Sequence, residues 1–399
     1  MSGIDNQLRD LLETAVGEPP RRVTVETVRR RVVRRRMLEA AGIGAVAVVV
    51  AGIGVATAFR VAGANAPSGP VSHAGAPRYY VQASFAGTAG RPQPVVIRAT
   101  ATGAVTATVR CPWPHSMIAP QGITAAGNRT FFMICQKVAG QGKLFAVTGA
   151  RIYRFQLTRS GRISGYFPVP GGVLGRHRPE DITATPDGSQ LAVTVGQATL
   201  GALQSVPAAV YVIDTQTGAR AIWHGGQNVF SAADLTFTHN GTALEFVGRK
   251  KCAQRRGGTA CEELRTISPA SAGGQLDSSH LLLPLSALAT HPGDSVNDVV
   301  INPGGATLAA AIVHSGRRLG SDSVSVVKYS TLNGRQLHVL YYMRTGNGFF
   351  YRFLSADPTG RYLIFNAGRT SGTLNGWIDH GRLITLTPAN GSNIRYETW

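Results

Sequence analysis

From Arg78 to the C-terminus, short apolar runs alternate with turn residues, which is the pattern of β-strands joined by tight turns. Four stretches in this region align on a shared glycine, with one run before the glycine and a second apolar run after it. They cover residues 181–195, 234–248, 298–312 and 353–367, with Gly188, Gly241, Gly305 and Gly360 in the turns. Because glycine enters a left-handed turn without steric cost, each stretch predicts a β-hairpin.

The hairpins form a repeat, and a weaker copy of it begins at Gly122. A second strand pair follows each hairpin, most clearly at 210–224 and 324–343. Each unit therefore predicts four antiparallel strands, the blade of a β-propeller. We expect an all-β fold of six blades, with seven as the alternative. The expected units are 119–168, 180–225, 233–285, 296–342 and 351–390, preceded by three strands in 78–112 that the tail 393–399 completes.

The unit 180–225 carries a family resemblance. The stretch from Thr185 to Val193, followed by 210–218, resembles the repeat of TolB-like and YVTN-type propellers. The chain lacks the Gly-His and Trp-Asp pairs of true WD repeats. The resemblance implies a rigid platform for proteins or small ligands, and it carries over no catalytic residue, because the repeat consists of turn and core positions.

One long apolar run lies outside the repeat, at residues 40–59, and contains no charged side chain. A helix of that length rises about 30 Å, the thickness of the hydrocarbon core of a bilayer. Eight arginines precede the run between 21 and 36, whereas Arg60 stands alone until Arg78. The positive-inside rule then predicts a short helical, basic cytoplasmic tail at 1–36, a transmembrane helix at 37–60, a flexible linker at 61–77 and an extracytoplasmic propeller at 78–399. A cleaved export signal is the alternative.

All four cysteines lie on the exported side of this span. An even number of cysteines in an exported domain predicts disulfides. Cys252 and Cys261 flank a short loop and favour local pairing, which leaves Cys111 to pair with Cys135. A metal site is the alternative, but no CxxC motif or histidine pair lies nearby.

The charge is strongly positive, with 40 basic and 21 acidic residues and a formal net charge of +19. Only five of the basic residues are lysine, a skew that suggests GC-rich coding of the actinobacterial type. No acidic residue occurs between 60 and 179, and a further basic cluster follows the hairpin at 234–248. It consists of Arg249, Lys250, Lys251, Arg255 and Arg256. This surface predicts an anionic cell-envelope partner. Alternatively, the basic residues are only solvated side chains at strand edges, where they discourage edge-to-edge pairing. Binding of nucleic acid is disfavoured, because no aromatic residues are interleaved with the basic ones.

Asp181, Asp234 and Asp298 each precede their turn glycine by seven residues, where the last repeat has Phe353. This position begins the innermost strand of a blade, so we expect the three carboxylates at the channel mouth. There they can bind a cation or a polar ligand, or accept hydrogen bonds from nearby backbone N–H groups.

Catalytic motifs are otherwise missing from the sequence, and we expect no cofactor and no metal. GxSxG, HExxH and Walker patterns do not occur, and the SxxK match from Ser325 to Lys328 lies in a predicted strand without a companion motif. The sequence thus favours a membrane-bound binding platform for a protein or ligand, coupled to the tail. A hydrolase- or lactonase-like propeller enzyme that uses the channel carboxylates is the alternative. The oligomeric state stays open.

Overall fold

The computed structural model describes residues 77–399, apart from fifteen segments within that range. These segments are 85–93, 114–115, 128, 142–143, 197–207, 227–228, 230, 251–261, 292, 315–322, 345–349, 370–371, 380–381, 386–393 and 399. The described residues belong to one compact unit, Ala66–Trp399. The expected tail, the expected transmembrane helix and nearly all of the expected linker lie outside the described residues. No helix among the described residues is long and apolar enough to span a membrane.

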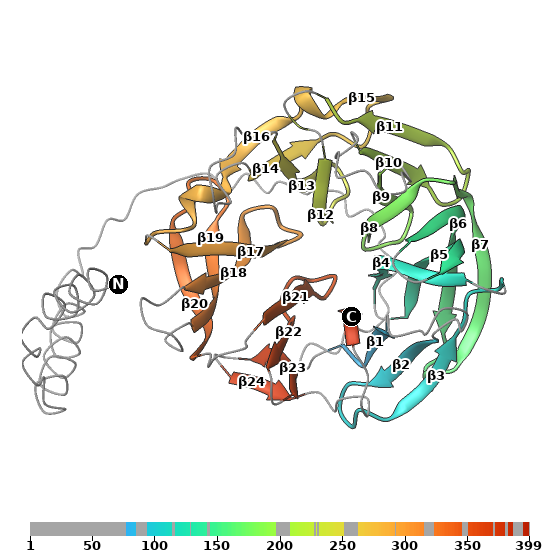
Figure 1. Ribbon diagram of the computed structural model, residues 1–399, viewed down its shortest axis with the longest axis horizontal. Coiled ribbons are helices and arrows are strands. Elements are labelled where there is room, and N and C mark those ends of the chain that lie inside the picture. Colours follow the sequence, from blue (N-terminus) through green and yellow to red (C-terminus); the bar gives the residue numbers. More distant parts are fainter. Residues whose placement is uncertain are drawn as a thin grey trace, which may run out of the picture. The chain divides into compact units, whose positions relative to one another are not determined.

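Six β-sheets are arranged radially around a central axis, and each is one blade (Figure 1). In blades 1 to 3 the strands run from the axis outward as follows. Blade 1 contains β25 (Ile394–Thr398), β1 (Tyr79–Ser84), β2 (Val95–Ala99) and β3 (Val105–Val109). Blade 2 contains β4 (Ser116–Ala126), β5 (Thr130–Gln141), β6 (Leu144–Leu157) and β7 (Ile163–Gly175). Blade 3 contains β8 (Arg178–Ala184), β9 (Gln190–Gly196), β10 (Ala209–Asp214) and β11 (Arg220–His224).

Blades 4 to 6 repeat this order. Blade 4 contains β12 (Ser231–Phe237), β13 (Leu244–Arg249), β14 (Glu262–Ile267) and β16 (His280–Pro284). Blade 5 contains β17 (Asp294–Ile301), β18 (Thr307–His314), β19 (Ser323–Ser330) and β20 (Gln336–Arg344). Blade 6 contains β21 (Phe350–Ala356), β22 (Leu363–Arg369), β23 (Gly372–Asp379) and β24 (Arg382–Thr385). The predicted count of six is confirmed, and seven is wrong.

The ring closes through its innermost strands. Each contacts the next around the axis, from β4 through β8, β12, β17 and β21 to β25, which contacts β4 again. β25 pairs antiparallel with β1, with Val81 opposite Thr398, so the C-terminal strand completes the first blade (Figure 1). This confirms the prediction for the tail.

The predicted hairpin turns are also confirmed. Gly188, Gly241, Gly305 and Gly360 have φ values of 71°, 68°, 72° and 69°, a backbone conformation that side chains other than glycine rarely adopt. At Gly360 the space is closed as well, because a Cβ atom would lie 2.7 Å from Cδ of Pro303. The turn of blade 6 therefore packs directly on the turn of blade 5.

The buried apolar side chains lie between blades. Among the described residues they form six clusters, one at each junction of neighbouring blades. Strand residues alternate between the two faces of a sheet, so every blade supplies side chains to both of its junctions. The cluster at the junction of blades 6 and 1 has the fewest described buried residues, namely Tyr80, Phe353, Tyr362 and Ile364. A single blade cannot bury both faces alone, which is why the fold needs the closed ring.

A disulfide joins Cys111, after β3, to Cys135 in β5 and so links blade 1 to blade 2. Its Cα atoms are 5.5 Å apart, within the usual range for such a bond. The predicted pair is confirmed. Cys252 and Cys261 lie outside the described residues, and their pairing stays a prediction.

One feature of the fold was not predicted. The chain between β14 and β16 includes β15 (Gly273–Gln275), which pairs in parallel with β11 and gives blade 3 a fifth strand. Two short 3₁₀ turns, η1 (Leu276–Ser278) and η2 (Leu285–Ala287), lie on either side of β16. The short glycine-rich strand has no apolar alternation that would have identified it.

Candidate functional site

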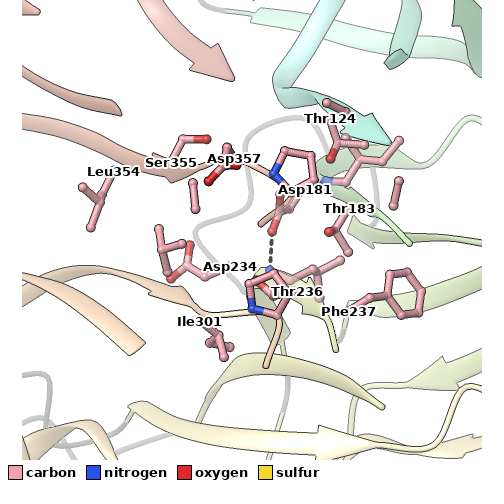
Figure 2. Close-up of a pocket in the computed structure, with 18 of the residues that line it drawn as sticks. Thr124, Asp181, Thr183, Asp234, Thr236, Phe237, Ile301, Leu354, Ser355 and Asp357 are labelled. Atoms are coloured by element: carbon pink, nitrogen blue, oxygen red, sulfur yellow. Dashed lines mark hydrogen bonds between the residues drawn. The ribbon is translucent and has the colours of Figure 1, made fainter. Parts of the chain in front are cut away.

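A cavity of about 120 Å³ lies among the inner strands β4, β8, β12, β17 and β21 (Figure 2). Asp181, Asp234 and Asp298 all line it, so the structure places the three predicted carboxylates together. In blades 3 to 6 the register between the inner strand and the second strand of the blade shifts by one residue beside the aspartate position. Such a bulge leaves the residue before Asp181 and the residue before Asp298 without a ladder partner, whereas in blade 4 the unpaired stretch includes Asp234 itself. The repeat therefore presents the same backbone feature at the axis in blades 3 to 6.

Asp181 and Asp298 use their carboxylates to join neighbouring blades. One oxygen of Asp181 accepts the N–H of Ile182 at 2.8 Å, and the other accepts the N–H of Leu235 in blade 4, also at 2.8 Å (Figure 2). Asp298 repeats the arrangement between blades 5 and 6, with the N–H groups of Val299 at 2.9 Å and Leu354 at 2.8 Å. These two carboxylates hold the ring together.

Asp234 differs from both. Its φ of 51° makes it the one described residue other than glycine with a left-handed backbone, a conformation that costs on the order of 1 kcal/mol or more. Among the described residues, no hydrogen-bond donor contacts its carboxylate, and the residue, which lines the cavity, is half-buried (Figure 2). Asp234 is the member of the three whose carboxylate is available to a ligand.

Burial shapes the charge of this cavity. Burial raises the pKa of Asp181 to about 6, although backbone N–H groups oppose the change. Burial also raises the pKa of Asp234 well above its usual range, and the charges of Asp298 and Asp181 raise it further. Desolvation and like charges both disfavour the ionised carboxylate, so Asp181 and Asp234 keep their protons to a higher pH than an exposed aspartate does.

Asp357 also lines the cavity, and the sequence did not indicate it, because Phe353 holds the aligned position in blade 6. Its carboxylate accepts the N–H groups of Tyr362 and Thr359 and so serves its own turn. Phe353 packs against Tyr80 of blade 1 in place of a carboxylate contact. Within the described ranges, no three His, Cys, Asp or Glu side chains come close enough to hold a metal ion.

The described part of the basic cluster is paired with acids. Arg249 lies 3.1 Å from Glu262, and Lys250 lies 2.5 Å from Glu263, which also contacts Arg265 at 2.6 Å. These ion pairs reduce the local positive field on which the expected anionic contact depends. Lys251, Arg255 and Arg256 lie outside the described residues.

Comparisons with known proteins concern the fold. No family model and no curated protein matches the chain. Among solved structures, TolB from Acinetobacter baumannii is similar at 16% identity and a TM-score of 0.45, over 80% of this chain and 65% of that one. This chain therefore spans just under two thirds of that protein's length. A putative TolB from Agrobacterium tumefaciens matches at 14% identity and a TM-score of 0.43, over 80% and 91% of the two chains.

An oligogalacturonate lyase in complex with manganese matches at 11% identity and a TM-score of 0.42, over 73% of this chain and 72% of that one. At these identities the likenesses assign no activity to this chain. The ring itself has the six blades that the repeat units of the sequence predict.

Proposed function

We propose that this chain is a single-pass membrane protein whose extracytoplasmic propeller binds a protein partner of the cell envelope. The apolar run at 40–59 supports the span, and the arginines before it support a cytoplasmic tail. One span would connect the binding platform to that tail. The basic stretch between 60 and 179 provides an additional surface for anionic polymers or lipid headgroups.

The observation that carries the binding role is the carboxylate of Asp234 at the axial cavity. The closed ring holds this group in a fixed place, so the propeller loses little conformational entropy when a ligand binds there. Asp181 and Asp298 are engaged by backbone N–H groups and leave Asp234 to meet the ligand. A lysine or arginine side chain from a partner would stabilise the ionised form of Asp234. Because the two charges would pair in the cavity, neither would be buried without a partner.

Capture from a membrane extract tests this role. The full chain, immobilised in detergent, should retain an envelope protein, and Asp234→Asn should lower the retained amount about tenfold or more. Glu180→Gln removes the same charge from the inner strand of the neighbouring blade 3, outside the cavity lining, and should change nothing. Equal capture by wild type and Asp234→Asn would exclude the cavity as the contact.

Topology is tested separately. With tags at both ends, external protease should remove the C-terminal tag and spare the N-terminal one, and the chain should stay with membranes after an alkaline wash. A mature chain without residues 1–60 would instead establish the cleaved export signal.

The second candidate is a propeller enzyme that uses the channel carboxylates. The raised pKa of Asp234 favours it, because a carboxyl group that stays protonated near neutral pH can act as a general acid. Hydrolysis of a lactone or ester that Asp234→Asn abolishes would support it over the binding role.

A further inference from the structure

A second polar constellation lies in blade 5, away from the axial cavity. Nδ1 of His314 is 2.7 Å from a carboxylate oxygen of Asp294, and Nε2 of the same ring is 2.8 Å from Oγ of Ser325. When Nδ1 carries the proton and donates it to Asp294, Nε2 is left to accept the hydroxyl proton of Ser325. The serine thus contacts a base, and a carboxylate orients that base.

The strand register explains how three distant residues meet. Asp294 at the start of β17 is directly opposite His314 at the end of β18, so their side chains share one face of the sheet. On β19, Ser323 is opposite His314, and Ser325 is two positions further along on the same face. Lys328 is three positions from Ser325 and projects from the other face, so the SxxK pair of the sequence does not form.

The outer strand adds donors beside the serine. Tyr342 on β20 is directly opposite Ser325, which puts the two side chains on one face. Hydrogen bonding with Ser323, together with Arg344, holds the pKa of Tyr342 below its usual range. A phenol of lowered pKa beside a guanidinium is a strong hydrogen-bond donor for a negatively charged oxygen.

We propose that Asp294, His314 and Ser325 form a catalytic triad for hydrolysis of carboxylic esters, with Tyr342 and Arg344 stabilising the oxyanion. Ser325 is the nucleophile, His314 is the general base and then the general acid, and Asp294 is a positioning residue that fixes the ring of His314. The axial cavity is not involved, since none of these residues lines it. This activity therefore stands apart from the binding role of Asp234.

The reaction balances with water as the second reactant. Oγ of Ser325 forms a bond to the ester carbonyl carbon, and its proton moves to Nε2 of His314. The tetrahedral oxyanion collapses, the bond to the alkoxy oxygen breaks, and the alcohol leaves with the proton from His314. Water then gives a proton to His314 while its oxygen forms a bond to the acyl carbon. The bond from that carbon to Oγ breaks, Oγ takes the proton back from His314, and the carboxylic acid leaves.

Access to the serine is from the side of its exposed neighbours. The side chain of His314 is 33% exposed and Tyr342 is 54% exposed, whereas Ser325 is only 4% exposed. A substrate carbonyl that reaches Oγ must therefore pass His314 and Tyr342, the groups to which the mechanism assigns proton transfer and oxyanion binding. This geometry favours small acyl groups.

A fluorophosphonate probe on the full-length chain tests the proposal directly. The probe phosphonylates a serine that a neighbouring base activates, with loss of fluoride, so wild type should be labelled and peptide mass mapping should place the adduct on Ser325. Ser325→Ala should abolish labelling, and His314→Gln should slow it about 100-fold or more. Hydrolysis of p-nitrophenyl acetate should follow the same order.

Controls separate catalysis from structure. Ser330→Ala, at the other end of β19, should leave labelling unchanged. Asp294→Asn should shift the pH profile of labelling, which a residue with a merely structural role would not do. The proposal is overturned when folded wild type is not labelled, or when the adduct maps to another serine. Because mapping uses wild type alone, a variant that fails to fold does not prevent the decision.

Discussion

The aspartate that precedes each turn glycine has two different roles in three adjacent blades. In blades 3 and 5 it accepts N–H groups from its own strand and from the next blade. In blade 4 the same residue type, at Asp234, has a left-handed backbone and no described donor. The chemistry of the side chain does not distinguish the two outcomes. The backbone conformation at the bulge does.

Replacing the bridging aspartate of blade 5 should therefore weaken the ring. Asp298→Ala leaves the buried N–H groups of Val299 and Leu354 without their acceptor, and we expect a loss of about 2 to 4 kcal/mol in the free energy of unfolding. Urea denaturation measures it, and hydrogen exchange should show faster exchange at Leu354. Asp234→Asn, which keeps a side chain that tolerates the left-handed backbone, is the control and should not destabilise the ring. A larger loss in the control would refute the division of roles.

The cavity carboxylates also predict how stability depends on pH. The folded pKa of Asp181 is about 6, above its ordinary value of 3.8, so the folded state binds more protons than the unfolded state between these values. The contribution of Asp181 to the free energy of unfolding should be fully present below pH 3.8 and be lost as pH rises through 6. The loss from this group is on the order of 3 kcal/mol. Asp234 extends the decrease to higher pH.

Thermal midpoints between pH 5 and 8 check this expectation. Carboxylates of lowered pKa, such as Asp214, titrate below this window and do not interfere. Wild type should melt at a lower temperature at pH 8 than at pH 5, and Asp234→Asn should reduce that difference. A midpoint that rises across the window would contradict the raised pKa values.

At the scale of strands, the repeat predicted the blades because hairpin turns and alternation are local signals. Gly188 and its three equivalents mark the turns, and the aspartates follow from the same alignment. The relay of Asp294, His314 and Ser325 could not be predicted, since it depends on the register of three strands and the residues are 11 to 31 positions apart. β15 was missed because its parallel pairing with β11 is long-range.

The disulfide makes the junction of blades 1 and 2 the best place to test a link between strands. Closing a loop of 24 residues should stabilise the chain by about 3 kcal/mol, chiefly through the unfolded state. The double variant Cys111→Ser with Cys135→Ser should lose that amount in urea denaturation. Substituting Cys252 and Cys261 in the same way is the companion experiment. An unchanged midpoint in the first variant would mean that the apolar cluster alone secures this junction.

At the scale of the whole molecule, the six junctions are unequal. Blades 1 and 2 share a disulfide and a large apolar cluster, and aspartates bridge blades 3 to 4 and 5 to 6. Counting only the side chains that the structure describes, the junction of blades 6 and 1 has the smallest apolar cluster, with Phe353 packed on Tyr80. It joins the last blade of the propeller to the first, and β25 is the covalent continuation of blade 6 into blade 1. Stability of the ring should therefore depend most on this strand.

Deleting residues 394–399 tests that dependence. The deletion removes the inner strand of blade 1 and exposes the edge of β1, so we expect a loss of roughly 1 kcal/mol for each ladder hydrogen bond that disappears, and association through the open edge. Urea denaturation and light scattering measure the two effects. A peptide of residues 392–399 should restore the midpoint when added to the truncated chain, whereas a scrambled peptide of the same composition should not. β25 contacts both β21 and β4, so it lies between the last and the first blades of the ring. Restoration by the peptide of native sequence alone would show that this strand closes the ring in one specific register. An unaltered midpoint after truncation would show that the junction closes without β25.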